Sequence, residues 1–131
     1  MISTKGRYAL RVMLDLADQD RNSLIPLKDI AERQEISKKY LEIIVKDLVN
    51  AGLVKGSSGK KGGYKLLRDP SEYTVGEIIE ATEGPILSVA CLAGETNTCP
   101  RAGTCRTLPL WAEYDKMTHD YFFSRKLSDL L

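Results

Sequence analysis

A glycine-rich segment with two lysines, from Gly56 to Gly63, constrains most strongly what this chain can fold into. It lies between apolar stretches at 53–55 and 64–67 that are typical of short strands, so it predicts a hairpin with a basic tip. A phosphate-binding loop is the alternative for such glycines. No helix is predicted directly after them, however, and their spacing fits neither the Walker nor the dinucleotide pattern. We therefore expect a hairpin that carries Lys60 and Lys61 at its tip.

Three helices are predicted before this hairpin. Apolar residues recur every three or four positions over about 7–20, and a short second helix follows Pro26. Ser37 is a suitable N-cap for a third helix over 38–51, whose apolar face consists of Leu41, Ile44, Val45 and Leu48. This order predicts a mainly α fold with a small β-hairpin, the winged helix-turn-helix, although the helix pair alone also fits a plain helical bundle.

The rest of the chain divides into three parts. Thr74 and Glu77 form a capping box for a fourth helix that ends at Gly84-Pro85. We therefore expect residues 1–84 to form one domain, the winged helix-turn-helix. Residues 85–106 show no periodicity and predict a loop, with at most one helical turn near 87–92. Residues 107–131 predict a helix capped by Thr107, followed by a tail.

Aromatic side chains lie along one stripe of this last helix, at Trp111, Tyr114, Tyr121 and Phe122. Such a stripe can cover the core of a monomer. A helix that follows a complete small domain and carries this much aromatic surface more often packs on a second copy, so we expect a dimerisation helix.

Charge is distributed unevenly between the two halves of the chain. Residues 1–65 contain 13 Lys and Arg against 8 Asp and Glu, whereas residues 66–131 contain 6 against 10. The basic half is where an anionic partner such as nucleic acid is expected to bind, and an ordinary solvated surface is the alternative.

The start of the third predicted helix is the expected site of DNA reading. Lys38 and Lys39 are placed to contact phosphates, and Tyr40 and Glu42 to face base edges, where Glu42 accepts a hydrogen bond from a cytosine amino group. Lys46 lies on the same polar face.

The hairpin tip is expected to add electrostatic affinity. Lys60 and Lys61 are long flexible cations that can follow a minor groove. Gly62 and Gly63 are interpreted as structural, either through a positive φ or through a close approach to DNA.

Cys91, Cys99 and Cys105 lie in the loop with gaps of seven and five residues. Glycines and proline in the loop allow three thiolates to converge, and thiolates suit iron–sulfur clusters, zinc and copper(I). Half-buried hydrophobic cysteines or a chance disulfide are the alternatives. The single histidine, His119, is expected on the surface of the last helix.

Several classes of protein are disfavoured. No apolar run is long enough to span a membrane and no signal peptide is present, which predicts a cytoplasmic protein without a membrane partner. No paired carboxylates or nucleophile–histidine constellation stands out, so we do not expect an enzyme.

Specific sequence blocks match a known family. These blocks are Ile2–Leu10, Tyr40–Glu42, Gly59–Tyr64 and Val75–Ile79, together with a three-cysteine loop that leads into Leu110-Trp111. Over nearly its whole length the chain resembles the IscR/NsrR/CymR family of bacterial winged-helix transcription regulators. The resemblance implies a homodimer on palindromic promoter DNA. In the cluster-binding branch it implies an iron–sulfur cluster, most simply 2Fe-2S, that senses iron–sulfur status or a reactive small molecule, and control of the genes of cluster assembly.

The resemblance also implies residue roles, with two departures. It assigns the cluster to Cys91, Cys99 and Cys105, but the first gap is seven residues instead of five and Leu108 stands where a ligating histidine is usual, so the fourth ligand is unknown. In the hairpin, Ser58 aligns with an arginine that contacts DNA. Two alternatives stay open: a CymR-like regulator that senses through a protein partner without a cluster, and an iron–sulfur redox protein that does not bind DNA.

Overall fold

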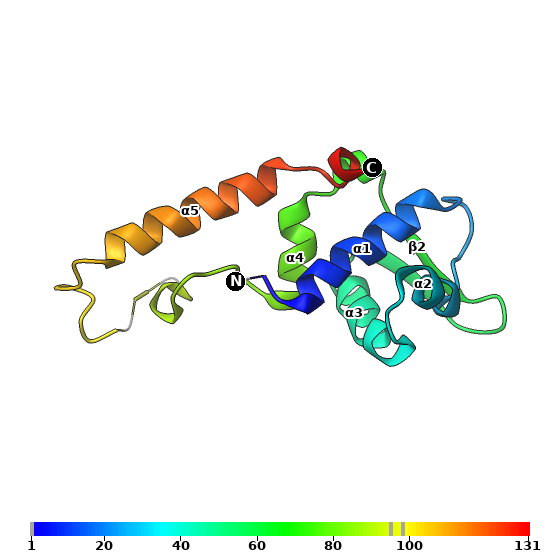
Figure 1. The fold of residues 1–131 in the computed structure, drawn as a ribbon, viewed down its shortest axis with the longest axis horizontal. Helices are drawn as coiled ribbons and strands as arrows, with labels where there is room; N and C mark the ends of the chain where they lie inside the picture. Colours follow the sequence, from blue (N-terminus) through cyan, green and yellow to red (C-terminus); the bar gives the residue numbers. More distant parts are fainter. Residues whose placement is uncertain (1, 95, 98) are drawn as a thin grey trace.

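The computed structural model describes residues 2–94, 96–97 and 99–131. Its head contains helices α1 (Thr4–Asp18), α2 (Leu27–Gln34) and α3 (Lys38–Asn50), strands β1 (Val54–Ser57) and β2 (Gly63–Leu66), and helix α4 (Val75–Glu83). Figure 1 shows these elements gathered at one side, while α5 (Leu108–Ser124) extends away from them. The expected mainly α winged helix-turn-helix is therefore confirmed.

α1 differs from its expected bounds of about 7–20. It starts at Thr4 because the Ser3 side chain accepts a hydrogen bond from the Gly6 N–H at 3.4 Å and caps the first turn. It ends at Asp18, since the following Gln19 has an extended backbone with φ −93° and ψ 172°. The helix thus covers the same apolar face but is displaced toward the N-terminus.

The predicted caps of α3 and α4 are both present. The Ser37 hydroxyl accepts from the Tyr40 N–H at 3.2 Å. At α4, the Thr74 hydroxyl accepts from the Glu77 N–H at 3.1 Å, and the Glu77 carboxylate accepts from the Thr74 N–H at 2.8 Å. Each cap satisfies backbone donors that have no partner inside the helix, so these starts are set by local sequence.

The two strands pair antiparallel, with Val54 opposite Leu66. The connection between α1 and α2 joins the other edge of β2, because Ile25 and Tyr64 exchange backbone hydrogen bonds of 2.8 and 2.9 Å. This pairing needs a glycine next to it: a Cβ on Gly63 would lie 2.5 Å from the Ile25 carbonyl carbon. The hairpin is therefore fixed to the helical part of the head at its root.

One contiguous core joins the helices to the root of the hairpin. Its buried members come from all elements of the head, and they include Ala9, Val12, Met13, Leu16, Ile30, Leu41, Ile44, Val45, Leu48, Leu53, Val54, Leu66, Tyr73 and Ile78. Burial of this apolar surface is the main favourable contribution to folding of the head.

Tyr73 closes the base of the hairpin. Its side chain is fully buried, and its hydroxyl donates to the Leu53 carbonyl at 2.6 Å. The same oxygen accepts from the backbone N–H groups of Leu67 and Arg68, each at 3.0 Å. Leu53 precedes β1 and Leu67 follows β2, so one hydroxyl satisfies backbone groups at both ends of the hairpin.

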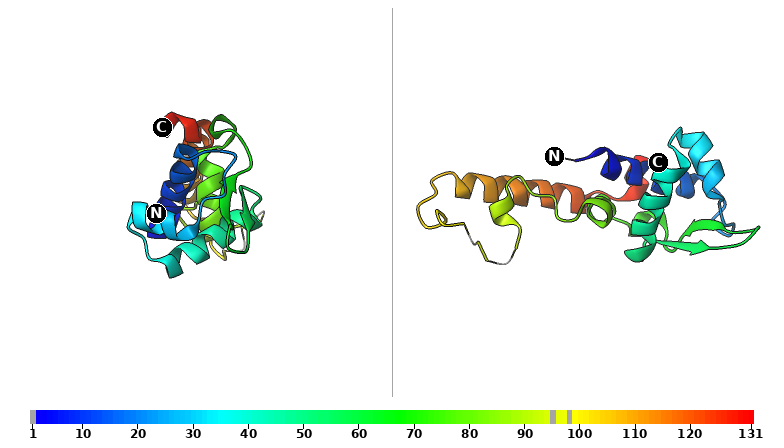
Figure 2. Two further views of the ribbon diagram at one scale, coloured as in Figure 1. Left: turned by 90° about the vertical axis from the view of Figure 1, so that its right-hand side faces the viewer. Right: turned by 90° about the horizontal axis from the view of Figure 1, so that it is seen from below.

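α5 is attached to the head near its C-terminal end. The Leu127 N–H donates to the Tyr73 carbonyl at 3.0 Å, and the Leu127 side chain enters the core. Phe123 packs so closely on α4 that a Cβ on Gly76 would lie 2.3 Å from its ring. Between residues 84 and 126, none of the side chains that the structure describes is buried. Figure 2 shows the hairpin and α5 projecting from opposite ends of the molecule.

Among the helices built from described residues, none is long and apolar enough to cross a bilayer.

Tyr73→Phe should destabilise the protein by about 1–3 kcal/mol, because it leaves the buried Leu53 carbonyl without its donor. Urea unfolding followed by circular dichroism measures this loss. Tyr8→Phe, which removes a hydroxyl from a half-buried tyrosine on α1, is the control and should cost less. Equal stability of Tyr73→Phe and the parent chain would show that the hydroxyl does not hold the hairpin base.

Candidate functional site

α3 presents a polar face to solvent, opposite the stripe that it buries. The stripe residues Leu41, Ile44, Val45 and Leu48 are at most 1% exposed. The outward side chains are exposed, and they are Lys38, Lys39, Glu42 and Lys46. Three cations on one free helix face form a surface suited to a polyanion.

Tyr40 is placed differently from the other four. It is half-buried, and its ring meets the Tyr8 ring edge-on, with centroids 5.9 Å apart and planes at 76°. Its contact with base edges stays a prediction, but part of the ring is used to join α3 to α1.

A buried carboxylate fixes the turn between α2 and α3. Asp15 of α1 is 3% exposed and accepts from the Arg33 guanidinium at 3.0 and 2.8 Å. It also accepts from the Gln34 side-chain amide at 2.9 Å. The hydrogen bond to Asp15 is the main reason that the pKa of Arg33 lies above its ordinary value. Since Arg33 and Gln34 end α2, this network holds the helix just before the turn.

Arg11 extends the same network along α1. Its Nε donates to the Gln34 side-chain carbonyl at 3.2 Å, and its guanidinium also contacts the Gln34 backbone carbonyl. The next residue, Glu35, has a left-handed backbone with φ 53° and reverses the chain toward α3. The position of the turn is therefore set from α1 by side chains that the sequence interpretation did not identify.

The hairpin tip carries the expected polar and cationic residues in the open. Ser58, Lys60 and Lys61 are all exposed. The glycines behind them make contacts inside the protein: a Cβ on Gly62 would lie 2.4 Å from the Ser57 carbonyl oxygen, and Gly63 lies against Ile25. These contacts explain both glycines, and the expected close approach to DNA is not needed to account for them.

A hollow of about 350 Å³ joins the two surfaces. It is lined from α3 by Lys46, Val49 and Asn50, and from the hairpin by Gly56, Ser57, Ser58 and Tyr64. Lys46 and Ser58, which lie apart in the sequence, thus border one depression between helix and hairpin.

The three cysteines are half-buried and form no disulfide among the described residues. Within that part of the chain, no three His, Cys, Asp or Glu side chains come together as metal ligands, so the expected convergence of the thiols is absent from this structure. The physical reason is that none of the described side chains of the loop is buried, so they do not fix its course. Thiol chemistry suits an iron–sulfur cluster, but the geometry shown here does not form its site.

Cys105 lies just before α5 and contacts a neighbouring hydroxyl group. Its Sγ is 3.5 Å from the Thr107 hydroxyl, and this contact, aided by the Thr107 backbone N–H, lowers the pKa of the thiol. The expected cap at Thr107 is wrong in one respect, since its side chain makes no capping hydrogen bond to α5. A thiol with a lowered pKa is more nucleophilic at neutral pH.

His119 lies on the outer surface of α5, as expected. Its imidazole is exposed, stacks on Phe123 with centroids 4.2 Å apart, and has Nδ1 3.6 Å from an Asp120 carboxylate oxygen. Both contacts are with neighbours on α5, so the imidazole lies along the surface of its own helix.

α5 carries a long exposed apolar stripe, and none of its residues, all of which the structure describes, is buried. The exposed members are Leu110, Trp111, Tyr114, Met117 and Tyr121. The sequence interpretation did not place Leu110 or Met117 in this stripe, although they share the same helical spacing. Phe122 is half-buried.

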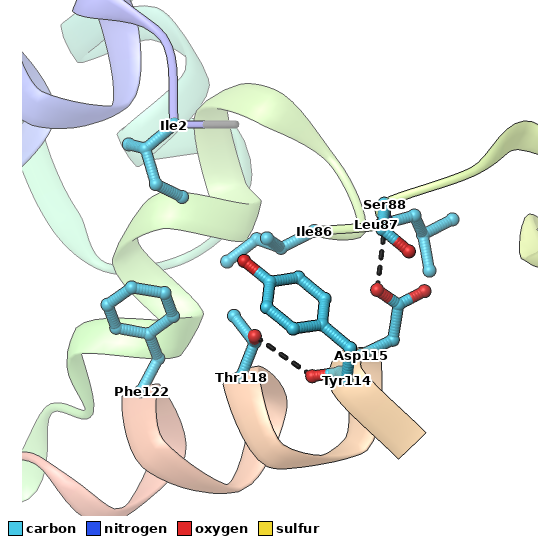
Figure 3. A pocket seen from close by; sticks show the side chains of 8 residues that line it. All are labelled: Ile2, Ile86, Leu87, Ser88, Tyr114, Asp115, Thr118 and Phe122. Atoms are coloured by element: carbon cyan, nitrogen blue, oxygen red, sulfur yellow. Dashed lines mark hydrogen bonds between the residues drawn. The ribbon is translucent and has the colours of Figure 1, made fainter. Parts of the chain in front are cut away.

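One side of this stripe faces the start of the 85–106 loop, which we call the linker. Tyr114, Thr118 and Phe122 of α5 line a hollow of about 200 Å³ together with Ile2 and Ile86. Figure 3 shows these side chains. Nearby, the Ser88 N–H donates to the Asp115 carboxylate at 3.0 Å and ties the linker to α5. The start of the cysteine loop is therefore attached to the middle of α5, the projecting arm of the molecule.

The sequence model of a known family, described as "Rrf2: Iron-dependent Transcriptional regulator", matches residues 2–131. The chain belongs to the Rrf2 family. The winged head is thus that of an Rrf2 transcriptional regulator. The sequence did not predict an enzyme, and membership of a family of regulators agrees with that prediction.

Relatives within the Rrf2 family include both types that the sequence blocks suggest. CymR of Bacillus subtilis is 47% identical over 94 residues, which cover 72% of this chain and 68% of that protein. IscR of Vibrio vulnificus is 35% identical over 130 residues, which cover 99% of this chain and 76% of that protein.

Solved structures of Rrf2 proteins have the same fold. The structure of CymR, described as the global cysteine regulator of B. subtilis, matches with a TM-score of 0.77 and 38% identity, over 99% of this chain and 95% of that one. T. potens IscR matches with a TM-score of 0.76 and 35% identity, over 99% and 85%. The chain is an Rrf2 regulator of the IscR/CymR type.

Glu42→Ala should relax the base preference at one half-site position, because Glu42 is outward on α3 and its carboxylate is expected to accept a hydrogen bond from a base amino group. Lys39→Ala, the matched variant on the same face, should weaken binding to all sequences about equally and reduce the salt slope by about one phosphate contact. Selection from a random duplex library followed by fluorescence anisotropy measures both effects. An unchanged preference profile for Glu42→Ala would show that another residue reads this position.

Proposed function

We propose that this Rrf2 regulator binds palindromic double-stranded promoter DNA as a homodimer, with α3 in the major groove and the hairpin tip over the adjacent minor groove. The observation that carries the proposal is the set of exposed cations on α3 and at the hairpin tip, together with the hollow between the two elements that Lys46 and Ser58 line. With α3 in the major groove and the tip over the minor groove, the phosphates of one duplex would meet cations from both elements.

The residues divide into positioning and reading roles. Lys38, Lys39 and Lys46 on α3 contact phosphates, while Glu42 faces base edges. Lys60 and Lys61 at the hairpin tip add electrostatic affinity, and Ser58, which directly follows β1, contributes a hydroxyl group. Titration of promoter duplexes at several salt concentrations tests this assignment, because affinity from phosphate contacts falls steeply as salt rises. Binding that did not depend on salt would overturn it.

The second half of the proposal is the homodimer. A helix that projects from the head with five exposed large apolar side chains gains only part of its packing within one chain, and most helical stability in proteins comes from packing of one face. Two copies of the stripe, related by a two-fold axis, would cover each other and present two reading heads to a palindrome. The stripe then includes Trp111, Tyr114, Tyr121 and Phe122, with Leu110 and Met117 added by the structure.

Replacement of Tyr114 and Tyr121 by Ala in one chain should shift the protein from dimer to monomer, since truncation of buried interface aromatics commonly costs at least 2 kcal/mol each. Sedimentation velocity at micromolar concentration measures the change. Glu113→Ala with Lys116→Ala, on another face of α5, is the matched control and should stay dimeric. A double tyrosine variant that still sediments as a dimer would move the interface away from this stripe.

The cysteine loop supports a sensing role. We expect Cys91, Cys99 and Cys105 to be the ligands of an iron–sulfur cluster, most simply 2Fe-2S, in a regulator of cluster assembly genes, with the fourth ligand unassigned. Thiolate ligands and the family description as iron-dependent favour this assignment. A bound cluster would supply bonds that respond to iron supply and oxidants. The linker contact between Ser88 and Asp115 would carry a change in the loop to α5 and so to the spacing of the reading heads.

A protein partner in place of the cluster is the second candidate. It is favoured by the similarity to CymR and by the separation of the three thiols in this structure. In that case the cysteines would not be metal ligands, although Cys105 would keep a thiol of lowered pKa.

Single replacement of Cys91, Cys99 or Cys105 by Ala should abolish the visible absorbance of protein loaded anaerobically with iron and sulfide. The head should stay folded in each variant, because its core lies outside the loop. Absorbance, iron analysis and far-ultraviolet circular dichroism measure these effects, with His119→Ala as the control that should keep the absorbance. Parent protein that takes up no iron would instead favour the protein-partner candidate.

A further inference from the structure

The outward face of α3 contains one aliphatic side chain that the fold does not explain. Ile43 is 50% exposed, whereas the stripe residues of the same helix are at most 1% exposed. Its position follows from the helical period, because it falls outside the spacing of Leu41, Ile44, Val45 and Leu48. A branched aliphatic residue left half in water gains little from folding, so its place invites a functional explanation.

The other aliphatic residue outside the stripe has a structural explanation. Val49 is 37% exposed and borders the hollow between α3 and the hairpin. Its Cγ2 would lie 3.6 Å from a Cβ built on Gly56, so it closes the space beside β1. Ile43 lies almost two turns nearer the N-terminus of α3.

The neighbours of Ile43 are the residues that the proposed function assigns to DNA. Lys39 and Lys46 lie four residues before it and three residues after it, hence on the same helix face, and Glu42 precedes it directly. If the lysines lie on phosphates and Glu42 on a base edge, Ile43 enters the major groove between them. It can neither donate nor accept a hydrogen bond.

The floor of the major groove offers one apolar group on ordinary DNA, the C5-methyl of thymine. Cytosine presents an amino donor there, and purines present N7 with either an amino group or a carbonyl. An aliphatic side chain against those polar groups would remove their water without replacing the hydrogen bonds, which costs free energy. Contact with a methyl group carries no such cost.

We propose that Ile43 is a specificity-determining residue that recognises the 5-methyl group of one thymine in each half-site. The inference rests on the proposed DNA-binding function and adds a base identity that hydrogen-bonding residues on α3 do not provide. Glu42 and Ile43 then select adjacent positions by opposite chemistry, a polar amino group and an apolar methyl group.

Replacement of thymine by deoxyuridine isolates this contact, because it removes the methyl group and leaves the pairing edge unchanged. The probe is the duplex that the full-length protein enriches from a random library, and deoxyuridine is placed at each thymine in turn. One position per half-site should weaken binding about fourfold, and replacement in both half-sites about fifteenfold, as burial of one methyl-sized group predicts.

Ile43→Ala should bind the thymine and deoxyuridine duplexes with equal affinity at that position. Leu67→Ala, which truncates an aliphatic side chain of similar exposure outside α3, is the matched control and should keep the fourfold discrimination. Thermal unfolding of both variants should match the parent chain, since neither residue belongs to the buried stripe.

Two results would overturn the inference: no thymine whose methyl group affects binding of the parent chain, or an Ile43→Ala variant that keeps the discrimination. Both are distinct from failure of the proposed function. That failure would appear earlier, as a parent chain that enriches no sequence from the library and binds every duplex alike at the same salt concentration.

Discussion

The hydroxyl of Tyr73 is the contact on which the arrangement of the head depends. It is buried and bonds three backbone groups at the two ends of the hairpin, while the backbone carbonyl of the same residue accepts from Leu127 after α5. One residue therefore links the hairpin to the point where the arm returns. Because a buried polar group that loses its partner is costly, the hairpin and arm cannot shift independently at this point without breaking such a bond.

Local patterns in the sequence predicted the order of helices, the hairpin and the caps of α3 and α4, because these depend on neighbouring residues. The start of α1 was placed about one turn late, since Ser3 was not recognised as its cap. The bond between Asp15 and Arg33 and the contacts of Tyr73 join segments far apart in the chain. No periodicity reports such pairs, so only the folded structure reveals them.

The candidate site was predictable to the extent that it follows from helical spacing. The exposed lysines of α3 lie where the period puts them, and Ile43 and Met117 were accessible to the same argument, but attention to charged and aromatic residues passed over them. The cysteine loop is the opposite case. Its sequence predicts that the three thiols act as a group, yet none of the described side chains in this aperiodic segment is buried, so nothing in them fixes how far apart the thiols lie.

The pairing of Ile25 with Tyr64 has a consequence for the solution behaviour of the protein. It covers one edge of β2, and β1 covers the other, so the free edge of this small sheet belongs to β1. That edge is only four residues long and includes Lys55 and Gly56. Short strands with a charged residue and a weak strand former are poor templates for edge-to-edge association. The protein can therefore extend a hairpin into solvent without exposing a surface that recruits other strands into aggregates.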